Sequence, residues 1–207
     1  ICSRRLVWSL EARLKVPALT LSFLLSAGCS ATEHVVYEEP PADLPANSYV
    51  YLGNWMACVT KLPETPGDHG QQSEELETRA CERIEPFRVG ARVPPDLHPY
   101  QEIPQPGGEV ALVLPIRSPE GHTGYLVVTH EDSVISAVQL TADFEVSDYS
   151  FSTVSPGDPI AKVDKAFGPR FSERPVPEIG GTLRDYAPFP FTIEYVDGVV
   201  YSIRVGM

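Results

Sequence analysis

Positive charge is scarce in this sequence. The 207 residues contain 16 lysines and arginines against 28 aspartates and glutamates, a formal net charge of −12. Four of the basic residues lie within residues 1–28, so the rest of the chain has 12 basic and 27 acidic residues, a net charge of −15. A surface of that sign repels nucleic-acid phosphates and anionic lipid headgroups. The composition therefore argues against nucleic acid as a partner.

A long hydrophobic run is also missing. The apolar run at residues 16–25 has ten residues, whereas a membrane-spanning helix needs about 20. A basic start precedes it and small residues follow it at 26–28, which is the layout of an export signal. We expect residues 1–28 to be a signal peptide. Arg4-Arg5 is interpreted as part of its basic start, with the twin-arginine export route as the alternative.

The stretch LSAGCS, residues 25–30, resembles the lipobox of bacterial lipoproteins. Ser26 departs from that pattern, because the family usually has an aliphatic residue three places before the cysteine. The resemblance implies that a lipid such as palmitate is attached at Cys29. Ser30, in place of an aspartate, implies sorting to the outer membrane, with the protein facing the periplasm. We therefore expect a membrane partner reached through an N-terminal lipid anchor.

The chain has only four cysteines. Cys2 belongs to the signal peptide and Cys29 would carry the lipid, so Cys58 and Cys81 remain. Two remaining cysteines in an oxidising compartment usually pair, and closing the loop of 22 intervening residues stabilises a fold by roughly 3 kcal/mol. A metal site would need more ligands than the lone His69 between them. The sequence predicts a Cys58–Cys81 disulfide.

Motifs that carry chemistry are also lacking. Neither HExxH nor GxSxG occurs, and the five histidines have no two-histidine zinc spacing. The titratable run at residues 130–132 is interpreted as a solvated hairpin tip. Asp143, Glu145 and Asp148 could hold calcium, but an acidic, exposed strand edge explains them as well. We predict no cofactor. A hydrolase with paired carboxylates stays open as an alternative.

Proline, by contrast, is abundant, with 21 residues, about twice average usage. Residues 29–48 combine prolines and acidic residues without an apolar period, which predicts a tether. Residues 49–207 are expected to form a single globular domain. Six prolines within residues 86–110 predict a long, extended connection there.

Residues rich in β-branched and aromatic side chains predict several strands. The predicted strands are 49–60 (one strand or a pair), 111–116 at a sheet edge because of Pro115, a hairpin of 125–130 and 133–140 joined by 131–132, and a hairpin of 191–196 and 199–205. The last hairpin flanks Asp197-Gly198, a strong signal for a two-residue turn.

One short helix is predicted after residue 158. Ile160, Val163 and Phe167 recur at helical spacing, with Asp158 as N-cap and Pro159 as the first helical residue. So short a helix is unstable alone, so it must pack on a sheet. The predicted fold is β-rich α+β, an antiparallel sheet of hairpins with one short helix packed on it.

The segments DSVISAVQL (132–140) and DGVVYSIRV (197–205) align without a gap, which suggests an internal duplication as a hypothesis. The turn at 155–158, the helix, Phe167-Gly168-Pro169 and the final hairpin make a module, about residues 134–207. This module resembles BamE-type assembly lipoproteins and the β-lactamase inhibitor protein. The resemblance implies a non-enzymatic, lipid-anchored module that binds another envelope protein. A secreted-type inhibitor and the hydrolase are the alternatives.

Overall fold

The computed structural model describes residues 47–60 and 79–206. The predicted signal peptide 1–28, the lipidation site Cys29 and the tether up to residue 46 lie outside the described residues. Within the described part, no helix is long and apolar enough to cross a membrane. The first strand starts at Ser48, one residue before the predicted start of the globular domain.

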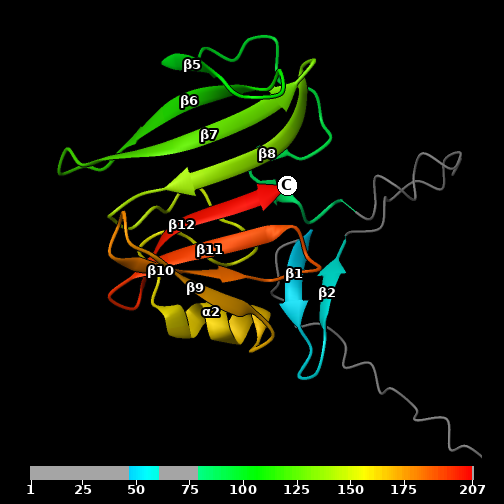
Figure 1. Ribbon diagram of the computed structural model, residues 1–207, viewed down its shortest axis with the longest axis vertical. Helices are drawn as coiled ribbons and strands as arrows, with labels where there is room; N and C mark the ends of the chain where they lie inside the picture. Colours follow the sequence, from blue (N-terminus) through cyan, green and yellow to red (C-terminus); the bar gives the residue numbers. More distant parts are fainter. Residues whose placement is uncertain (1–46, 61–78, 207) are drawn as a thin grey trace, which may run out of the picture. The chain divides into compact units, whose positions relative to one another are not determined.

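An eight-stranded antiparallel sheet dominates the fold and confirms the β-rich α+β class (Figure 1). Its strands are β5 (Gln101–Pro104), β6 (Val110–Arg117), β7 (Thr123–Glu131), β8 (Val134–Thr141), β9 (Ser172–Val176), β10 (Gly181–Asp185), β11 (Phe191–Val196) and β12 (Val199–Gly206). Their order is β5-β6-β7-β8-β12-β11-β10-β9. The sheet therefore consists of two four-stranded meanders, β5–β8 and β9–β12. They meet at the centre, where β8 pairs with β12.

The hairpins β7–β8 and β11–β12 share an irregularity. The register of the first shifts between Thr129 and His130, and that of the second between Glu194 and Tyr195. The two shifts are 65 residues apart, the offset at which the two hairpin sequences align. A shared β-bulge at matching positions is what an internal duplication predicts, because bulges are kept within families.

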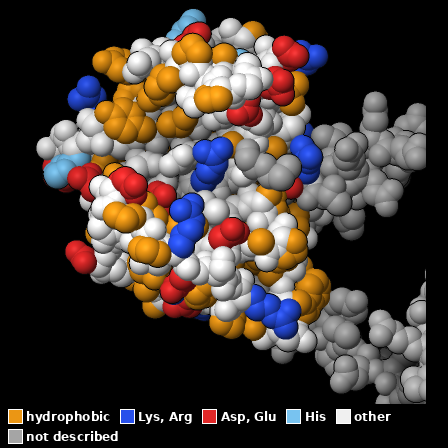
Figure 2. Space-filling view, in the orientation of Figure 1, with side chains coloured by type: hydrophobic (Ala, Val, Ile, Leu, Met, Phe, Trp, Pro, Cys, Tyr) orange, Lys and Arg blue, Asp and Glu red, His pale blue; other side chains and the backbone are white. Residues whose placement is uncertain are grey.

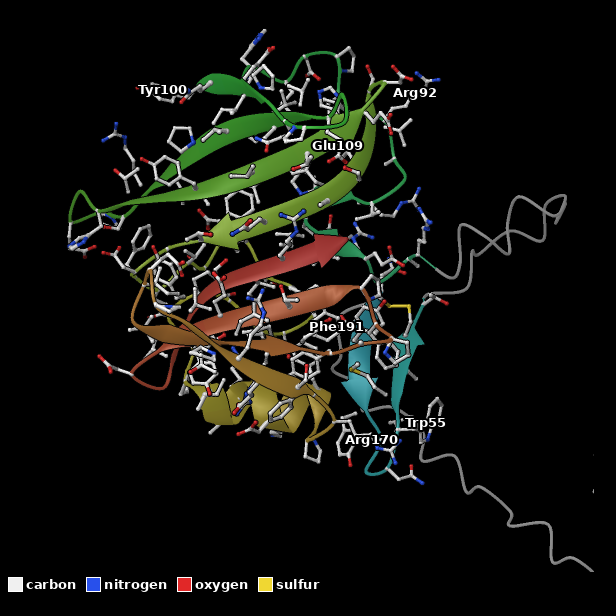
Figure 3. The ribbon with its side chains drawn as sticks, in the orientation of Figure 1. Trp55, Arg92, Tyr100, Glu109, Arg170 and Phe191 are labelled. Atoms are coloured by element: carbon white, nitrogen blue, oxygen red, sulfur yellow. A yellow bond between two sulfur atoms is a disulfide. The ribbon has the colours of Figure 1, made fainter. Side chains whose placement is uncertain are left out.

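One face of the sheet, here called the inner face, is covered by the core. Four further strands and one helix supply the cover, namely β1 (Ser48–Tyr51), β2 (Met56–Val59), β3 (Arg83–Ile84), β4 (Phe87–Arg88) and α2 (Ile160–Phe167). Their buried side chains include Tyr49, Ile84 and Phe167, which share one cluster with the sheet residues Leu126 and Ile203. Phe191 lies in the aromatic part of this cluster (Figure 3), its ring centroid 4.7 Å from those of Phe151 and Tyr186.

The helix α2 packs as its spacing predicts. Val163 and Phe167 are buried, and Ile160 is partly buried against the same cluster. The predicted cap is wrong, because Pro159 is the N-cap residue and makes no side-chain capping bond. The Asp158 carboxylate instead accepts a hydrogen bond from the Ser155 N–H at 2.7 Å and binds Lys162 at 2.8 Å. The carboxylate thus closes the preceding turn.

The disulfide between Cys58 and Cys81 is present, with the two Cα atoms 5.7 Å apart. Cys58 lies on β2, while Cys81 is buried two residues before β3. The bond therefore joins the β1–β2 hairpin to the β3–β4 hairpin, two elements that cover the inner face.

Several local predictions differ from the structure. The connection 86–110 contains the strands β4 and β5, and the β7–β8 turn lies at Asp132-Ser133, one residue later than predicted. The strand β6 is not at the edge, because β5 pairs with residues 110–113. Pro115 lies beyond that paired stretch, so its missing N–H costs no hydrogen bond to β5.

Candidate functional site

The face of the sheet opposite the core, the outer face, carries side chains from all eight strands. Because the side chains of a strand alternate between faces, the register defines a row of outer residues that crosses the sheet. Following the paired Cα atoms gives Gln101, Val113, Val127, Gln139, Arg204, Thr192, Asp185 and Ser172. The row is apolar only on β6 and β7, and it is polar or charged on β5 and from β8 onward.

Several apolar side chains lie on the outer face of β5, β6 and β7. Tyr125 and Ile103 are 43% and 38% exposed, and Val113 and Val127 are half-buried. In Figure 2 hydrophobic side chains gather over β6 and β7, while basic side chains lie where β8, β12 and β11 run. Large exposed apolar side chains that lie together on one face are typical of a binding surface.

The centre of the outer face is a hydrogen-bonded polar cluster. The Gln139 Nε2 donates to Ser202 Oγ at 3.0 Å and to Thr141 Oγ1 at 3.3 Å, and Thr141 Oγ1 donates to Ser202 Oγ at 3.1 Å. These side chains satisfy one another, whereas Arg204 beside them is exposed. The cluster therefore holds the surface beside the exposed side chain of Arg204.

A groove of about 550 Å³ lies on the outer face at the turn end of β11–β12. Its apolar walls include Ile179, Val196, Val199 and Tyr201, and its charged lining consists of Asp143 and Glu178. Val199 is 42% exposed, and both carboxylates lie at the exposed rim. The described lining thus combines an apolar interior with charge of one sign.

Backbone contacts hold both walls of the groove. The N–H of Ala142, next to Asp143, donates to the Tyr201 carbonyl at 3.0 Å, and the N–H of Ile179 donates to the Val176 carbonyl at 3.3 Å. A glycine is required at position 181, because a Cβ there would lie 2.5 Å from the Tyr195 carbonyl oxygen. The loops that carry the carboxylates are therefore anchored to the sheet.

A cluster of ion pairs lies on the inner face of the sheet. Arg184 is nearly buried and binds Asp164 of α2 at 2.5 Å and Glu173 of β9 at 2.8 Å. Its guanidinium also stacks 4.1 Å from the Phe171 ring centroid. The hydrogen bond from Arg184 holds the pKa of Glu173 below its usual value, although slight burial opposes this. This cluster joins the helix to the sheet.

A smaller pocket of about 250 Å³ lies at the C-terminal end of α2. Tyr51, Trp55, Arg170 and Phe189 contribute to its lining, and Figure 3 shows Trp55 and Arg170 close together at that end. Gly168 is required beside it, because its φ is +71° and a Cβ would meet the Tyr51 ring at 2.4 Å.

The acidic residues that the sequence singles out do not form a metal site. Within residues 47–60 and 79–206, no group of three or more histidine, cysteine or acidic residues could hold a metal ion, so Asp143, Glu145 and Asp148 do not form a calcium site. His130 is half-buried next to the β7–β8 turn, and its Nδ1 is buried without a hydrogen-bond partner among the described atoms. No local sequence pattern predicts the groove, because its residues come from three separate segments.

Comparison with known proteins returns no match to a family model, to a curated protein or to a solved structure.

Proposed function

We propose that this chain is a lipid-anchored, non-enzymatic protein of the bacterial cell envelope that binds another protein through the outer face of its sheet. The observation that carries the proposal is the outer face itself. It presents the exposed side chains of Tyr125 and Ile103, an exposed arginine at its centre and a groove at one end. Protein interfaces combine apolar anchors with a polar, charged surround in this way.

The lipobox-like stretch supports the anchoring part of the proposal. Cys29→Ser is expected to abolish fatty-acid labelling and to release the protein from the membrane fraction. Unchanged labelling of that variant, or an intact residue 1–28 segment in the mature protein by mass spectrometry, contradicts anchoring. The proposed location is the outer membrane, with the domain facing the periplasm.

Site-specific photo-cross-linking in envelope membranes tests the binding part. A photoreactive amino acid at Tyr125, on the outer face, is expected to give a discrete cross-linked protein band. The matched control places the same amino acid at Lys162, an exposed residue of α2 on the other side of the sheet. Equal products from both positions, or none from Tyr125, contradict the proposal.

The alternative of an envelope hydrolase has one observation in its favour. Asp143 and Glu178 line the same groove, and paired carboxylates can act as acid and base or nucleophile in glycoside hydrolysis. Release of sugar from envelope polysaccharide by the wild-type chain, lost in both Asp143→Asn and Glu178→Gln, would establish this alternative.

A further inference from the structure

The groove at the turn end of β11–β12 restricts the chemistry of what it can bind. Its interior is lined by Ile179, Val196 and Val199, and its two charged lining residues, Asp143 and Glu178, are both acidic. An apolar interior favours an aliphatic group, because burying it removes apolar surface from water. Two carboxylates at the rim favour a cation next to that group.

We propose that this groove binds a segment of the partner protein in which a lysine or arginine adjoins an aliphatic residue. The aliphatic side chain enters between Ile179 and Val199, and the cation lies at the rim near Asp143 and Glu178. This inference rests on the proposed protein-binding function and names the chemistry of the partner. The charge of the whole chain, −12, agrees with it, because an acidic protein attracts a basic partner over long distances.

The groove suits an extended segment. It is open, and a volume of about 550 Å³ lies within the range of about 300–1,000 Å³ that ligand pockets span. Both carboxylates are attached to backbone that is hydrogen-bonded to the sheet, so little ordering is needed when the segment binds. Since the carboxylates are exposed, each ion pair with the segment is weak and screened by salt.

The test measures fluorescence anisotropy of labelled peptides with the full chain in neutral detergent. The probe is a pentapeptide of alternating leucine and lysine with a neutral fluorophore on its N-terminus and an amidated C-terminus, and its counterpart has glutamate in place of lysine. We expect the lysine peptide to bind at least about tenfold more tightly, since the sign of the charge at the rim reverses between the peptides. Raising the salt concentration weakens its binding.

Variants locate the site. The double variant Asp143→Asn with Glu178→Gln is expected to bind the lysine peptide about three- to tenfold more weakly, the loss expected for two exposed ion pairs. The matched control, Glu120→Gln with Asp148→Asn, removes the same charge from exposed positions outside the groove and should bind as the wild type. Glu178→Lys should bind the glutamate peptide more tightly than the wild type does.

Equal affinity for the two peptides, or an equal loss in the groove and control variants, overturns the inference. If the Tyr125 cross-link persists in that case, the protein binds its partner through another part of the outer face. If the peptide results hold but no cross-link forms, the preference of the groove stands and the proposed function fails. The two proposals can therefore be separated.

Discussion

Gln139 of β8 and Arg204 of β12 lie directly opposite one another at the centre of the sheet, and they are 65 residues apart in sequence. At the same offset of 65 residues, Thr141 corresponds to Gly206 and Ala137 corresponds to Ser202. Across the two strands, Thr141 pairs with Ser202 and Ala137 pairs with Gly206. Equivalent residues of the two hairpins therefore make equivalent pairs on either side of Gln139–Arg204. Two similar hairpins related by an approximate two-fold axis explain both this symmetry and the matching bulges.

Truncation of Phe167 should destabilise the fold strongly. Its side chain is 1% exposed and contacts the rings of Phe151 and Phe191 at centroid distances of 5.5 and 5.0 Å. Phe167→Ala is expected to lower the free energy of unfolding by about 3–5 kcal/mol, because it leaves a cavity. Urea denaturation measures this. Exposed Lys165→Ala on the same helix should stay within about 0.5 kcal/mol of the wild type, and a similar small effect at Phe167 contradicts the packing.

Loss of the disulfide should also destabilise the domain. Cys58→Ser with Cys81→Ser is expected to lower the free energy of unfolding by roughly 3 kcal/mol, since the unfolded chain regains the entropy of an open loop. The midpoint of chemical denaturation measures the effect. A reducing agent should lower the midpoint of the wild type and leave that of the double variant unchanged, and a wild type insensitive to reduction argues against this role.

Stability should depend on the charge of Glu173 in acid. The hydrogen bond from Arg184 holds the pKa of this carboxyl below its usual value. A carboxylate with a lowered pKa stabilises the folded state above its unfolded pKa, about 4.3, and this contribution is lost as the pH falls through the folded pKa. We expect Glu173→Gln to be less stable than the wild type at pH 7 by up to about 1 kcal/mol, because the carboxylate is partly exposed. The difference should shrink as the pH falls below about 4.3 and vanish below the lowered folded pKa, and a pH-independent difference contradicts the prediction.

The β11–β12 turn should reject β-branched residues at position 198. Asp197 and Gly198 have φ values of 50° and 79°, as a type I′ turn requires. A Cβ at 198 meets nothing within 4 Å, so any cost comes from the backbone conformation. Gly198→Val is expected to lower the free energy of unfolding by about 1–2 kcal/mol, which thermal or urea denaturation measures, whereas Gly198→Asn should cost less. Equal effects of the two substitutions argue against the turn type.

The sequence by itself determined the features that depend on residues close together along the chain, and the disulfide. Asp197-Gly198 specifies its turn because few residue types accept positive φ. The spacing of Val163 and Phe167 specifies the buried side of α2 because a helix repeats every 3.6 residues. Cys58 and Cys81 were paired by elimination. Each of these predictions is confirmed.

Only the tertiary structure decided the order of the sheet and the candidate site. The strand β9 has the sequence SERPV, which resembles a loop, because the strand propensity of a segment depends on the strand beside it. The pairing of β8 with β12 joins residues about 65 apart, and no local pattern specifies such a contact. The groove likewise draws Asp143, Glu178 and Val199 from three segments, and it exists because the sheet brings those segments to one end.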